Sequence, residues 1–470
     1  MDFRRTTVVA IASQVRSGEL AAREVTEQAL ARIEELDPAV NAFVAVDGAR
    51  ALEQAAAVDQ VVASGGDPGP LAGVPLAVKD NEDAAGYRTT HGSALMATAP
   101  MAEHDSSHVE RLRAAGCVVV GKTNLPELSW SASTTNDLFG TTHNPWHLDH
   151  TVGGSSGGSA AALAAGMVPL ATGSDGGGSI RIPSACCGLS GFKPSLGRVP
   201  AGGSEGPGWI DLSSKGPMGR TVADAVAALD TVVGPDPTDL RSLPRPEASW
   251  PHVLTDPHVP ARVAWSPTLG YAEPDAEVQA ICERALALLE SLGAEIVQID
   301  TVFDTDPVGV WLTYVGACLL RTLEPYRGQP AWFRMDPILS MVVDHAKSTT
   351  AQQLVEAMDE CHRMNLALVE LFHDVRLLLT PTTAAAAPPL DLDGSAMVNG
   401  EPTPNWVRYT YPFNMTRSPA ASVCAGLTSA GLPVGLQLIG PQHGDLVVLR
   451  SAAALEQALG FDELAPIGRD

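Results

Sequence analysis

Two glycine-rich segments each carry serines that could take part in hydroxyl chemistry. The first reads Gly153-Gly154-Ser155-Ser156-Gly157-Gly158-Ser159, and the second reads Gly173-Ser174-Asp175-Gly176-Gly177-Gly178-Ser179-Ile180-Arg181. Glycine at this density costs conformational entropy on folding, a cost that proteins accept where the backbone must come close to a ligand or a reacting atom. The pattern therefore indicates serine chemistry supported by backbone N–H groups.

Ser179 is the candidate nucleophile, because the glycines before it allow the backbone to curl and several N–H groups to point at one spot. Such a nest can hold a tetrahedral oxyanion. A serine hydroxyl also needs a base within hydrogen-bonding reach. No histidine stands in a recognisable triad context, and Arg181 breaks the G-x-S-x-G elbow at its last position.

Lys79 is the candidate base. It ends an apolar segment, and a desolvated lysine can lose its proton near neutral pH. Ser155 could pass the proton of Ser179 to Lys79, as in serine–lysine variants of the catalytic triad. Taken alone, Lys79 would read as an ordinary solvated lysine, but the two serine loops favour the catalytic interpretation.

The elements that must position these residues alternate between strand and helix patterns. They predict one large α/β domain covering residues 1–470, with a mixed, mostly buried β-sheet sandwiched by α-helices. Segment 117–120 is wholly apolar, as is typical of a strand buried on both faces. Strands are expected at 71–78, 117–120, 168–172, 262–265, 295–299, 375–379 and 434–439, and helices at 19–36, 106–115, 159–165 and 275–292.

Composition narrows the possible partners and the location. The net charge is −24, from 54 acidic and 30 basic residues, which argues against binding to nucleic acid or to anionic membranes. No apolar run is long enough to span a membrane, and the first residues lack the apolar run of a secretory leader, so we expect neither element. The seven cysteines are odd in number and lack a C-x-x-C spacing, so we expect reduced thiols in a cytoplasmic protein.

Two other patterns have plainer interpretations. His143, His147 and His150 lie close to Asp149, but Pro145 disfavours a helix that would bring them together, so we interpret them as loop histidines and expect no metal site. The serines before the predicted helix at 159–165 could instead cradle a phosphate. Neither a P-loop nor a dinucleotide-binding fingerprint supports that alternative.

The order of the motifs resembles that of the amidase signature family, whose enzymes use a Ser–cis-Ser–Lys triad. The resemblance covers most of the chain, and the 24 positions between Ser155 and Ser179 fit it. It rests on the blocks 73–80, 121–127, 144–146, 153–159, 178–183, 191–194, 216–218 and 431–437.

The resemblance implies specific roles. Ser179 would be the nucleophile, Lys79 the terminal base, and Ser155 the bridging serine after a cis peptide bond. The oxyanion hole would consist of the N–H groups of Gly176, Gly177, Gly178 and Ser179. Ser156, Asp175 and Arg181 would support the loop, and a carboxylate-binding role for Arg181 is an alternative. No cofactor is needed. The core motif region would span about 71–225 and a variable substrate-shaping region about 300–412, in which the role of 381–412 stays open.

The same resemblance places Leu128, Ser129 and Trp130 along the acyl-binding channel, although Trp130 could equally be a core residue. Segment 308–333 is dense in aromatic residues, among them Trp311, which could shape specificity or pack in the core. No cationic group stands out as an anchor for a carboxylate. Gly176 stands where the family often carries Thr or Ile, which should leave more room beside the scissile group.

We therefore expect an amidohydrolase that cleaves a neutral, apolar or aromatic amide through a Ser179 acyl-enzyme. One alternative is a carbamate or ester hydrolase with the same triad, which a roomier site would suit. A second is the glutaminase subunit of a tRNA-dependent amidotransferase, which needs a partner chain. A third is a non-catalytic anion- or nucleotide-binding protein. Homodimers are common among the relatives, so a homodimer is a further expectation.

Overall fold

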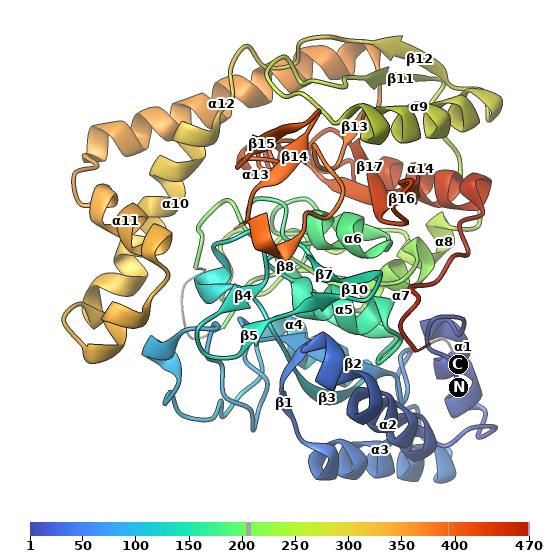
Figure 1. Ribbon diagram of the computed structural model, residues 1–470. Helices are drawn as coiled ribbons and strands as arrows, with labels where there is room; N and C mark the ends of the chain where they lie inside the picture. The colour runs from blue at the N-terminus through green and yellow to red at the C-terminus, as the bar shows by residue number, and fades with distance from the viewer. Residues whose placement is uncertain (204–207, 393, 469–470) are drawn as a thin grey trace.

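Two β-sheets form the centre of the protein, with helices packed around them (Figure 1). The computed structural model describes residues 1–203, 208–392 and 394–468. The first sheet has the strand order β1-β3-β2-β8-β10 and the second the order β12-β11-β13-β17-β16-β9. Their edge strands β10 and β9 lie in contact, so the two sheets meet there. The predicted mixed α/β class is confirmed, although hydrogen bonding divides the expected sheet in two.

The strands that carry the site belong to the first sheet and are buried throughout. β2, β3 and β8 run parallel to one another in its middle, where their apolar runs are covered on both faces. The bounds of the sheet strands are β1 (Phe43–Val46), β2 (Pro75–Lys79), β3 (Val118–Thr123), β8 (Leu170–Asp175), β9 (Gly191–Lys193), β10 (Ser214–Gly219), β11 (Arg262–Trp265), β12 (Glu295–Gln298), β13 (Leu378–Pro381), β16 (Ala420–Leu427) and β17 (Pro433–Ile439).

Helices cover the two sheets in layers. Two short buried helices, α5 (Gly157–Ala164) and α6 (Arg181–Cys187), pack on the first and the second sheet respectively. The others are α1 (Val8–Arg16), α2 (Ala22–Val40), α3 (Gly48–Ala63), α4 (Ser107–Ala114), α7 (Val222–Val232), α8 (Trp250–Val253), α9 (Ala276–Ser291), α10 (Val308–Leu323), α11 (Pro337–Ala346), α12 (Ala351–Asp374), α13 (Pro412–Met415) and α14 (Asp445–Leu459).

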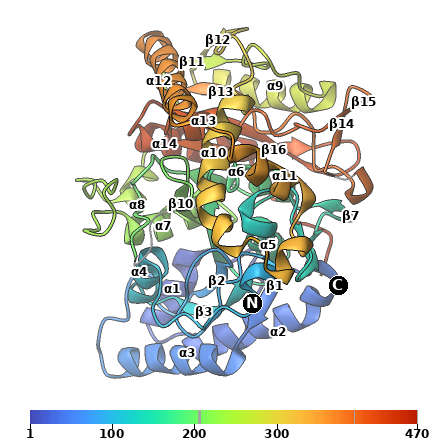
Figure 2. The same ribbon diagram turned by 90° about the vertical axis from the view of Figure 1, so that its left-hand side faces the viewer.

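Helix α10 matters most for the site, because it runs along the flank of the core that Figure 2 turns toward the viewer. It packs against α11 and α12. The sequence patterns did not predict these three helices, and segment 381–412, which they left irregular, contains the hairpin of β14 (Ala396–Val398) and β15 (Glu401–Thr403).

The first predicted helix continues farther than expected. The predicted helix ends at residue 36, yet α2 continues through Pro38 to Val40 and is capped by Asn41, which adopts a left-handed φ of 55°. Proline removes one hydrogen bond to the carbonyl of Glu34. Both Pro38 and Glu34 are exposed, so water can replace that bond.

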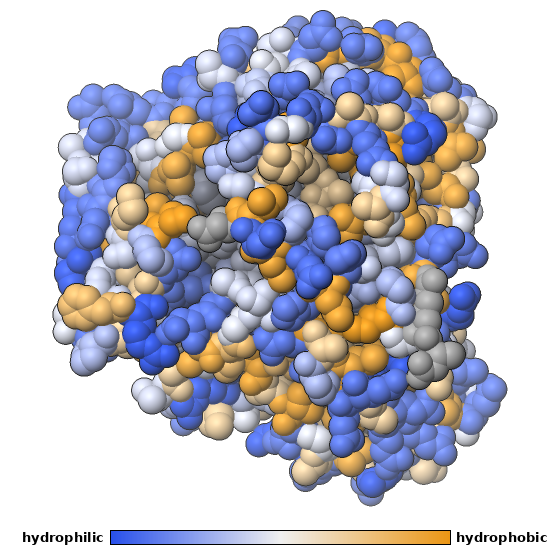
Figure 3. Space-filling model, in the orientation of Figure 1, coloured by the Kyte–Doolittle hydropathy of each residue, from blue (hydrophilic) through white to orange (hydrophobic). Residues whose placement is uncertain are grey.

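The surface carries both hydrophilic and hydrophobic residues (Figure 3). Hydrophilic residues predominate on the face shown in Figure 3. Within the described residues, every helix is too short or too polar to cross a membrane. All seven cysteines are free, as expected from their spacing.

Candidate active site

Lys79, at the end of β2, is the centre of a cluster of serine hydroxyls. Its Nζ lies 2.8 Å from Ser155 Oγ, 3.0 Å from Ser156 Oγ and 2.9 Å from Ser174 Oγ. All of these side chains are buried. Its backbone N–H donates to Thr172 Oγ1 of β8, which fixes the end of the strand.

Burial lowers the pKa of Lys79 well below its ordinary value, and the positive charge of Lys215 lowers it further. Glu82 and Asp175 oppose this shift. Depression of this pKa favours the neutral amine, which can donate two hydrogen bonds and accept one. Because Ser156 Oγ donates to the carbonyl of Ser174 at 3.3 Å, the proton of Ser155 is better placed than that of Ser156 for sharing with Nζ.

Ser155 follows a cis peptide bond to Gly154 in the loop before α5. The next N–H, that of Ser156, donates to the carbonyl of Ser179 at 3.2 Å and so ties the two glycine-rich loops together. The N–H of Gly158 donates to the carbonyl of Asn124. The start of α5 is therefore occupied by backbone contacts.

Ser179 lies at the end of the second loop and is 9% exposed. Among the residues that the structure describes, its Oγ has no hydrogen-bond partner, so the expected contact with Ser155 Oγ is not formed. The structure thus brings Lys79, Ser155 and Ser156 together and holds Ser179 beside them through its backbone. Catalytic hydrogen bonds are often long in free enzymes and shorten on substrate binding.

The loop before Ser179 is held by its carbonyl groups. Each of them accepts a hydrogen bond from outside the loop or from the next turn: Asp175 O from Asn414 Nδ2 (2.6 Å), Gly176 O from Trp311 Nε1 (3.1 Å), Gly177 O from Thr410 Oγ1 (2.6 Å), Gly178 O from Ile182 N (2.7 Å) and Ser179 O from Ser156 N (3.2 Å). Fixing every carbonyl in this way also fixes the direction of every N–H.

The N–H groups divide into two sets. Asp175 accepts from the N–H of Gly178 at 2.8 Å, and from those of Ile180 and Arg181 at longer distances. The expectation that Gly178 contributes to the oxyanion hole is therefore corrected, because its N–H is already engaged. Within the described chain, the N–H groups of Gly176, Gly177 and Ser179 have no partner and can serve a ligand.

Arg181 and Asp175 form a buried ion pair at 2.8 Å beneath the loop. Arg181 also donates to the carbonyl of Thr410 and to the side chains of Gln437 and Asn414. Its guanidinium is fully used and buried, so it cannot bind a substrate carboxylate. Burial raises the pKa of Asp175, but the charge and hydrogen bonds of Arg181, together with Lys193 and Asn414, hold this pKa well below its usual range.

Aromatic rings pack directly on the glycines of the loop. A Cβ on Gly176 would lie 2.5 Å from the ring of Trp209, and one on Gly177 would lie 2.9 Å from the ring of Trp311. Trp311 also contacts Trp130 and Trp209, with ring centroids 5.9 and 5.8 Å apart. The expectation of extra room at Gly176 is therefore wrong, because Trp209 fills it.

The three residues expected to line the acyl channel, Leu128, Ser129 and Trp130, lie close to the serine and tryptophan side chains. Ser129 Oγ accepts from Asn81 Nδ2 at 3.3 Å, and the same amide group donates to Ser174 Oγ at 2.9 Å. Leu128 and Ser129 both adopt left-handed backbone conformations, with φ of 52° and 62°. Consecutive residues of this kind are uncommon outside functional sites. Trp130 stacks on Trp311.

Charged side chains form a second, largely buried group near Lys79, which includes Lys215 and Glu82. Lys122 and Asp80 are paired at 3.0 Å. Glu82 pairs with His108 at 3.1 Å and with Lys215 at 3.6 Å. Although burial opposes it, the positive charge of Lys215 and the contact with His108 lower the pKa of Glu82 to about 2. Glu82 therefore stays ionised and balances part of the positive charge around Lys79.

The histidines at 143, 147 and 150 belong to a hairpin of β6 (His143–Asn144) and β7 (His147–Thr151), not to a helix. His147 and His150 pack edge to face. In the part of the chain that the structure describes, no three His, Cys, Asp or Glu side chains are arranged to hold a metal ion.

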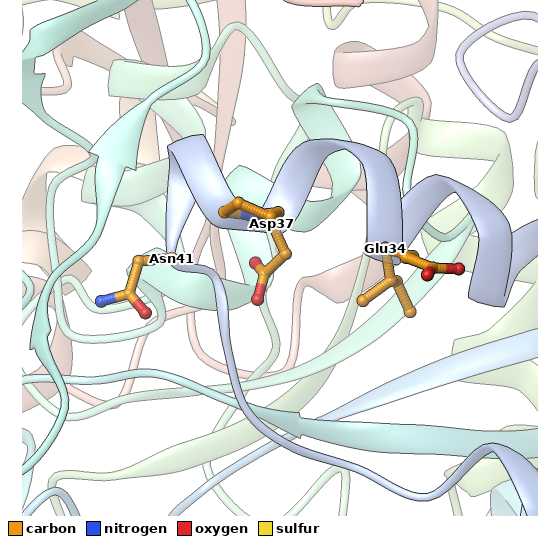
Figure 4. A pocket seen from close by; sticks show the side chains of 5 residues that line it. Glu34, Asp37 and Asn41 are labelled. Atoms are coloured by element: carbon orange, nitrogen blue, oxygen red, sulfur yellow. The ribbon is translucent and has the colours of Figure 1, made fainter.

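An open hollow of about 430 Å³ lies at the end of α2, outside the serine cluster. Figure 4 shows Glu34, Asp37 and Asn41 along this end of the helix. Asp37 accepts from the N–H groups of Ala42 and Phe43, and Asn41 donates to the carbonyls of Phe139 and Thr141. These polar groups fix the turn into β1, so the hollow has a structural explanation.

Several residues around the site were not found from the sequence. Ser174 had a readable signal, because it alternates with Thr172 along β8 and must share a face with it. Trp209, Thr410 and Asn414 had none, because they come from distant segments that only the fold brings to the loop.

Known proteins resemble this chain in sequence and in fold. The family model described as Amidase matches residues 24–449. The chain is 37% identical over 465 residues to the acylamidase of Rhodococcus erythropolis, covering 97% of this chain and 96% of that protein. It is 35% identical over 484 residues to a glutamyl-tRNA(Gln) amidotransferase subunit of Synechococcus sp. (strain CC9605), covering 97% of each. A solved bacterial aryl acylamidase of the amidase signature family has a TM-score of 0.92 and 30% identity, covering 99% of both chains. The chain belongs to the amidase signature family.

Proposed function

We propose that the protein is an amide hydrolase that works through a covalent Ser179 acyl-enzyme. The observation that carries this proposal is the contact of 2.8 Å between the buried amine of Lys79 and Ser155 Oγ, beside a loop with free N–H groups. A candidate base, a candidate proton carrier and a loop with free N–H groups lie together, and this arrangement supports nucleophilic attack by a serine.

In the acylation step, Ser179 Oγ forms a bond to the carbonyl carbon of the amide. Its proton passes to Ser155, whose own proton passes to Lys79 Nζ. The electron pair of the carbonyl double bond moves to the oxygen, which accepts hydrogen bonds from Gly177 and Ser179. The C–N bond then breaks as Lys79 returns a proton through Ser155 to the leaving nitrogen. An amine departs, and an ester on Ser179 remains.

In the second half of the reaction, water replaces the amine. It loses a proton through the same relay as its oxygen attacks the ester carbonyl. The second tetrahedral intermediate collapses, the C–Oγ bond breaks, and Ser179 regains its proton. A carboxylic acid leaves, so each cycle consumes one amide and one water.

We propose a neutral substrate with an apolar or aromatic group. The half-buried rings of Trp130, Trp209 and Trp311 beside the loop support this preference, and so does the likeness to an acylamidase. Arg181 is occupied by Asp175, which removes one candidate for binding an anionic substrate. Because the ring of Trp209 fills the space beside Gly176, a roomier site does not favour carbamates.

Two alternative functions have less support from the structure. The similarity to the glutamyl-tRNA(Gln) amidotransferase chain supports a glutaminase as one alternative. Glutamine hydrolysis that appears only with a partner chain would support that function. A phosphate-binding role at the start of α5 is disfavoured, because the N–H groups of Ser156 and Gly158 are engaged and the serine hydroxyls contact Lys79.

The test of the proposal combines turnover with covalent labelling. We expect the wild type to hydrolyse aryl amides such as 4-nitroacetanilide and Ser179→Ala to be inactive with an unchanged fold. A fluorophosphonate should add to Ser179, as peptide mass spectrometry can locate. Parallel assays on the matching aryl carbamate and ester measure preference. Unchanged kcat in Ser179→Ala would refute the nucleophile assignment.

A further inference from the structure

Trp311 of α10 contacts the nucleophile loop in two ways. Its indole Nε1 donates to the carbonyl of Gly176 at 3.1 Å. Its ring lies so close to Gly177 that a Cβ there would be 2.9 Å from Cζ2. The residue is half-buried, and its ring also contacts Trp130, Trp209 and Tyr411.

The carbonyl of Gly176 and the N–H of Gly177 belong to one planar peptide unit. In a trans peptide these two groups point in opposite directions. A donor that holds the carbonyl on one side therefore turns the N–H toward the other side, and it also polarises the unit so that the N–H becomes a better donor. Among the described residues, this N–H has no protein partner.

The neighbouring peptide unit shows the same arrangement with a different outcome. Thr410 holds the carbonyl of Gly177, and the N–H of that unit, on Gly178, points to Asp175. The Gly178 N–H is thus used for structure, whereas the Gly177 N–H is oriented by Trp311 and left free. Of these two peptide units, the one held by Trp311 is therefore the one whose N–H is available to a ligand.

We propose that Trp311 is a positioning residue for the oxyanion, which aims and polarises the Gly177 N–H through the carbonyl of Gly176. The inference rests on the proposed function, since it needs an oxyanion at the Ser179 loop. It adds a residue of the variable helical region to the apparatus that stabilises charge. Trp311 touches the loop and not the reacting atoms, so its effect is on geometry.

The first test is Trp311→Phe, which keeps an aromatic ring and removes the donor. Loss of a complete oxyanion donor costs roughly 10²–10³ in kcat, so misaligning one should lower kcat by about tenfold. KM should stay within about twofold, since a neutral ground-state carbonyl gains little from this donor. Substituting 3-benzothienylalanine, which replaces the ring N–H by sulfur at nearly constant shape, repeats the test with less change in packing.

The second readout separates positioning from general loosening of the loop. An aryl trifluoromethyl ketone forms a tetrahedral adduct with an active serine and carries the oxyanion. Its inhibition constant should rise by the same factor by which kcat/KM falls, because both report binding of the charged oxygen. The inhibition constant of an unreactive analogue of the same shape should not change.

Trp146→Phe is the matched control. Trp146 Nε1 donates to the carbonyl of Cys187 at 2.8 Å, and its ring lies 3.0 Å from a Cβ built on Gly188. As in Trp311, an indole N–H donates to a backbone carbonyl and the ring packs on a glycine, but Trp146 binds at the end of α6 that is distant from Ser179. We expect a comparable change in Tm and an unchanged kcat.

The outcomes are distinct. Full kcat in both Trp311 variants, or an equal loss in Trp146→Phe, would overturn the role of Trp311. If Ser179→Ala is inactive while Trp311→Phe is fully active, only this inference fails. If Ser179→Ala remains active, the proposed function fails with it.

Discussion

Asp175 Oδ1 and Arg181 Nη2 lie 2.8 Å apart with neither side chain exposed to solvent. The two residues flank Ser179, and the carboxylate also accepts three N–H groups of the loop between and beside them. This buried charge pair thus helps to fix the shape of the nucleophile loop, together with the contacts to its carbonyl groups. A pair of this kind is costly to break, because the remaining partner is left charged and out of water.

We predict that Asp175→Asn lowers the free energy of unfolding by about 3–5 kcal/mol and abolishes amide hydrolysis. Asparagine has nearly the same shape, but it cannot balance the charge of Arg181. Urea unfolding followed by circular dichroism measures the loss. Glu360→Gln, which removes a partly exposed partner of Arg363, is the control and should cost less than about 1 kcal/mol. A small loss in Asp175→Asn would show that the loop is held by other contacts.

A second prediction concerns the stability of the protein against pH. The folded pKa of Lys79 lies below the ordinary value of 10.5. Between these two pKa values, the unfolded chain binds one more proton than the folded protein, so this residue makes stability rise with pH by about 1.4 kcal/mol per unit. Below the folded pKa the amine is charged in both states and the effect is flat.

Lys79→Met lacks this dependence. The free energy of unfolding of the wild type minus that of Lys79→Met should therefore increase steadily from the folded pKa of Lys79 toward pH 10.5. Urea titrations at several pH values in that range measure the difference. Lys347→Met removes an exposed lysine and should follow the wild-type profile in parallel. A parallel profile for Lys79→Met as well would contradict the shifted pKa.

The parts of the site that the sequence predicts are those whose signal is local. Lys79 follows an apolar run and Ser155 lies in a glycine-rich loop, so each could be found without the fold. Asn414 and Trp209 reach the loop from outside its neighbourhood in the chain, and nothing in their local sequence marks them. The engagement of the Gly178 N–H also depended on geometry, since it was decided by where Asp175 points.

The helices of the flank were missed for a different physical reason. Several of their apolar side chains face solvent, such as Ile338 at 61% and Met341 at 70% exposure in α11, and this obscures the periodicity of a buried face. One local signal was readable. Thr350 and Gln353 form a capping box at the start of α12, a spacing that predicts a helix start.

The contact between Gly176 and Trp209 predicts a compensating pair of substitutions. In Gly176→Ala, the new Cβ would lie 2.5 Å from the ring of Trp209, so the ring or the loop must move and kcat should fall. Trp209→Leu should remove the clash and recover much of the loss when combined with Gly176→Ala. Kinetics of the two single variants and the double variant form the cycle that measures this coupling. Additive effects would mean that the ring does not limit residue 176.

The last prediction joins the catalytic lysine to the charges behind it. Hydrolysis needs the neutral amine of Lys79, so kcat/KM should fall at acid pH as the amine takes up a proton. The positive charge of Lys215 makes that protonation harder, whereas Glu82 and Asp175 make it easier.

Lys215→Met removes the opposing charge and leaves the ionised Glu82 near Lys79. The pKa of Lys79 should rise, and the acid limb of the kcat/KM profile should move to higher pH while the plateau changes little. Lys347 is exposed and pairs with Glu324, outside this cluster, so Lys347→Met should not shift the acid limb. Two results would contradict the assignment of Lys79 as the base. One is an acid limb that moves to lower pH in Lys215→Met, and the other is a flat wild-type kcat/KM profile from about pH 5 to 9.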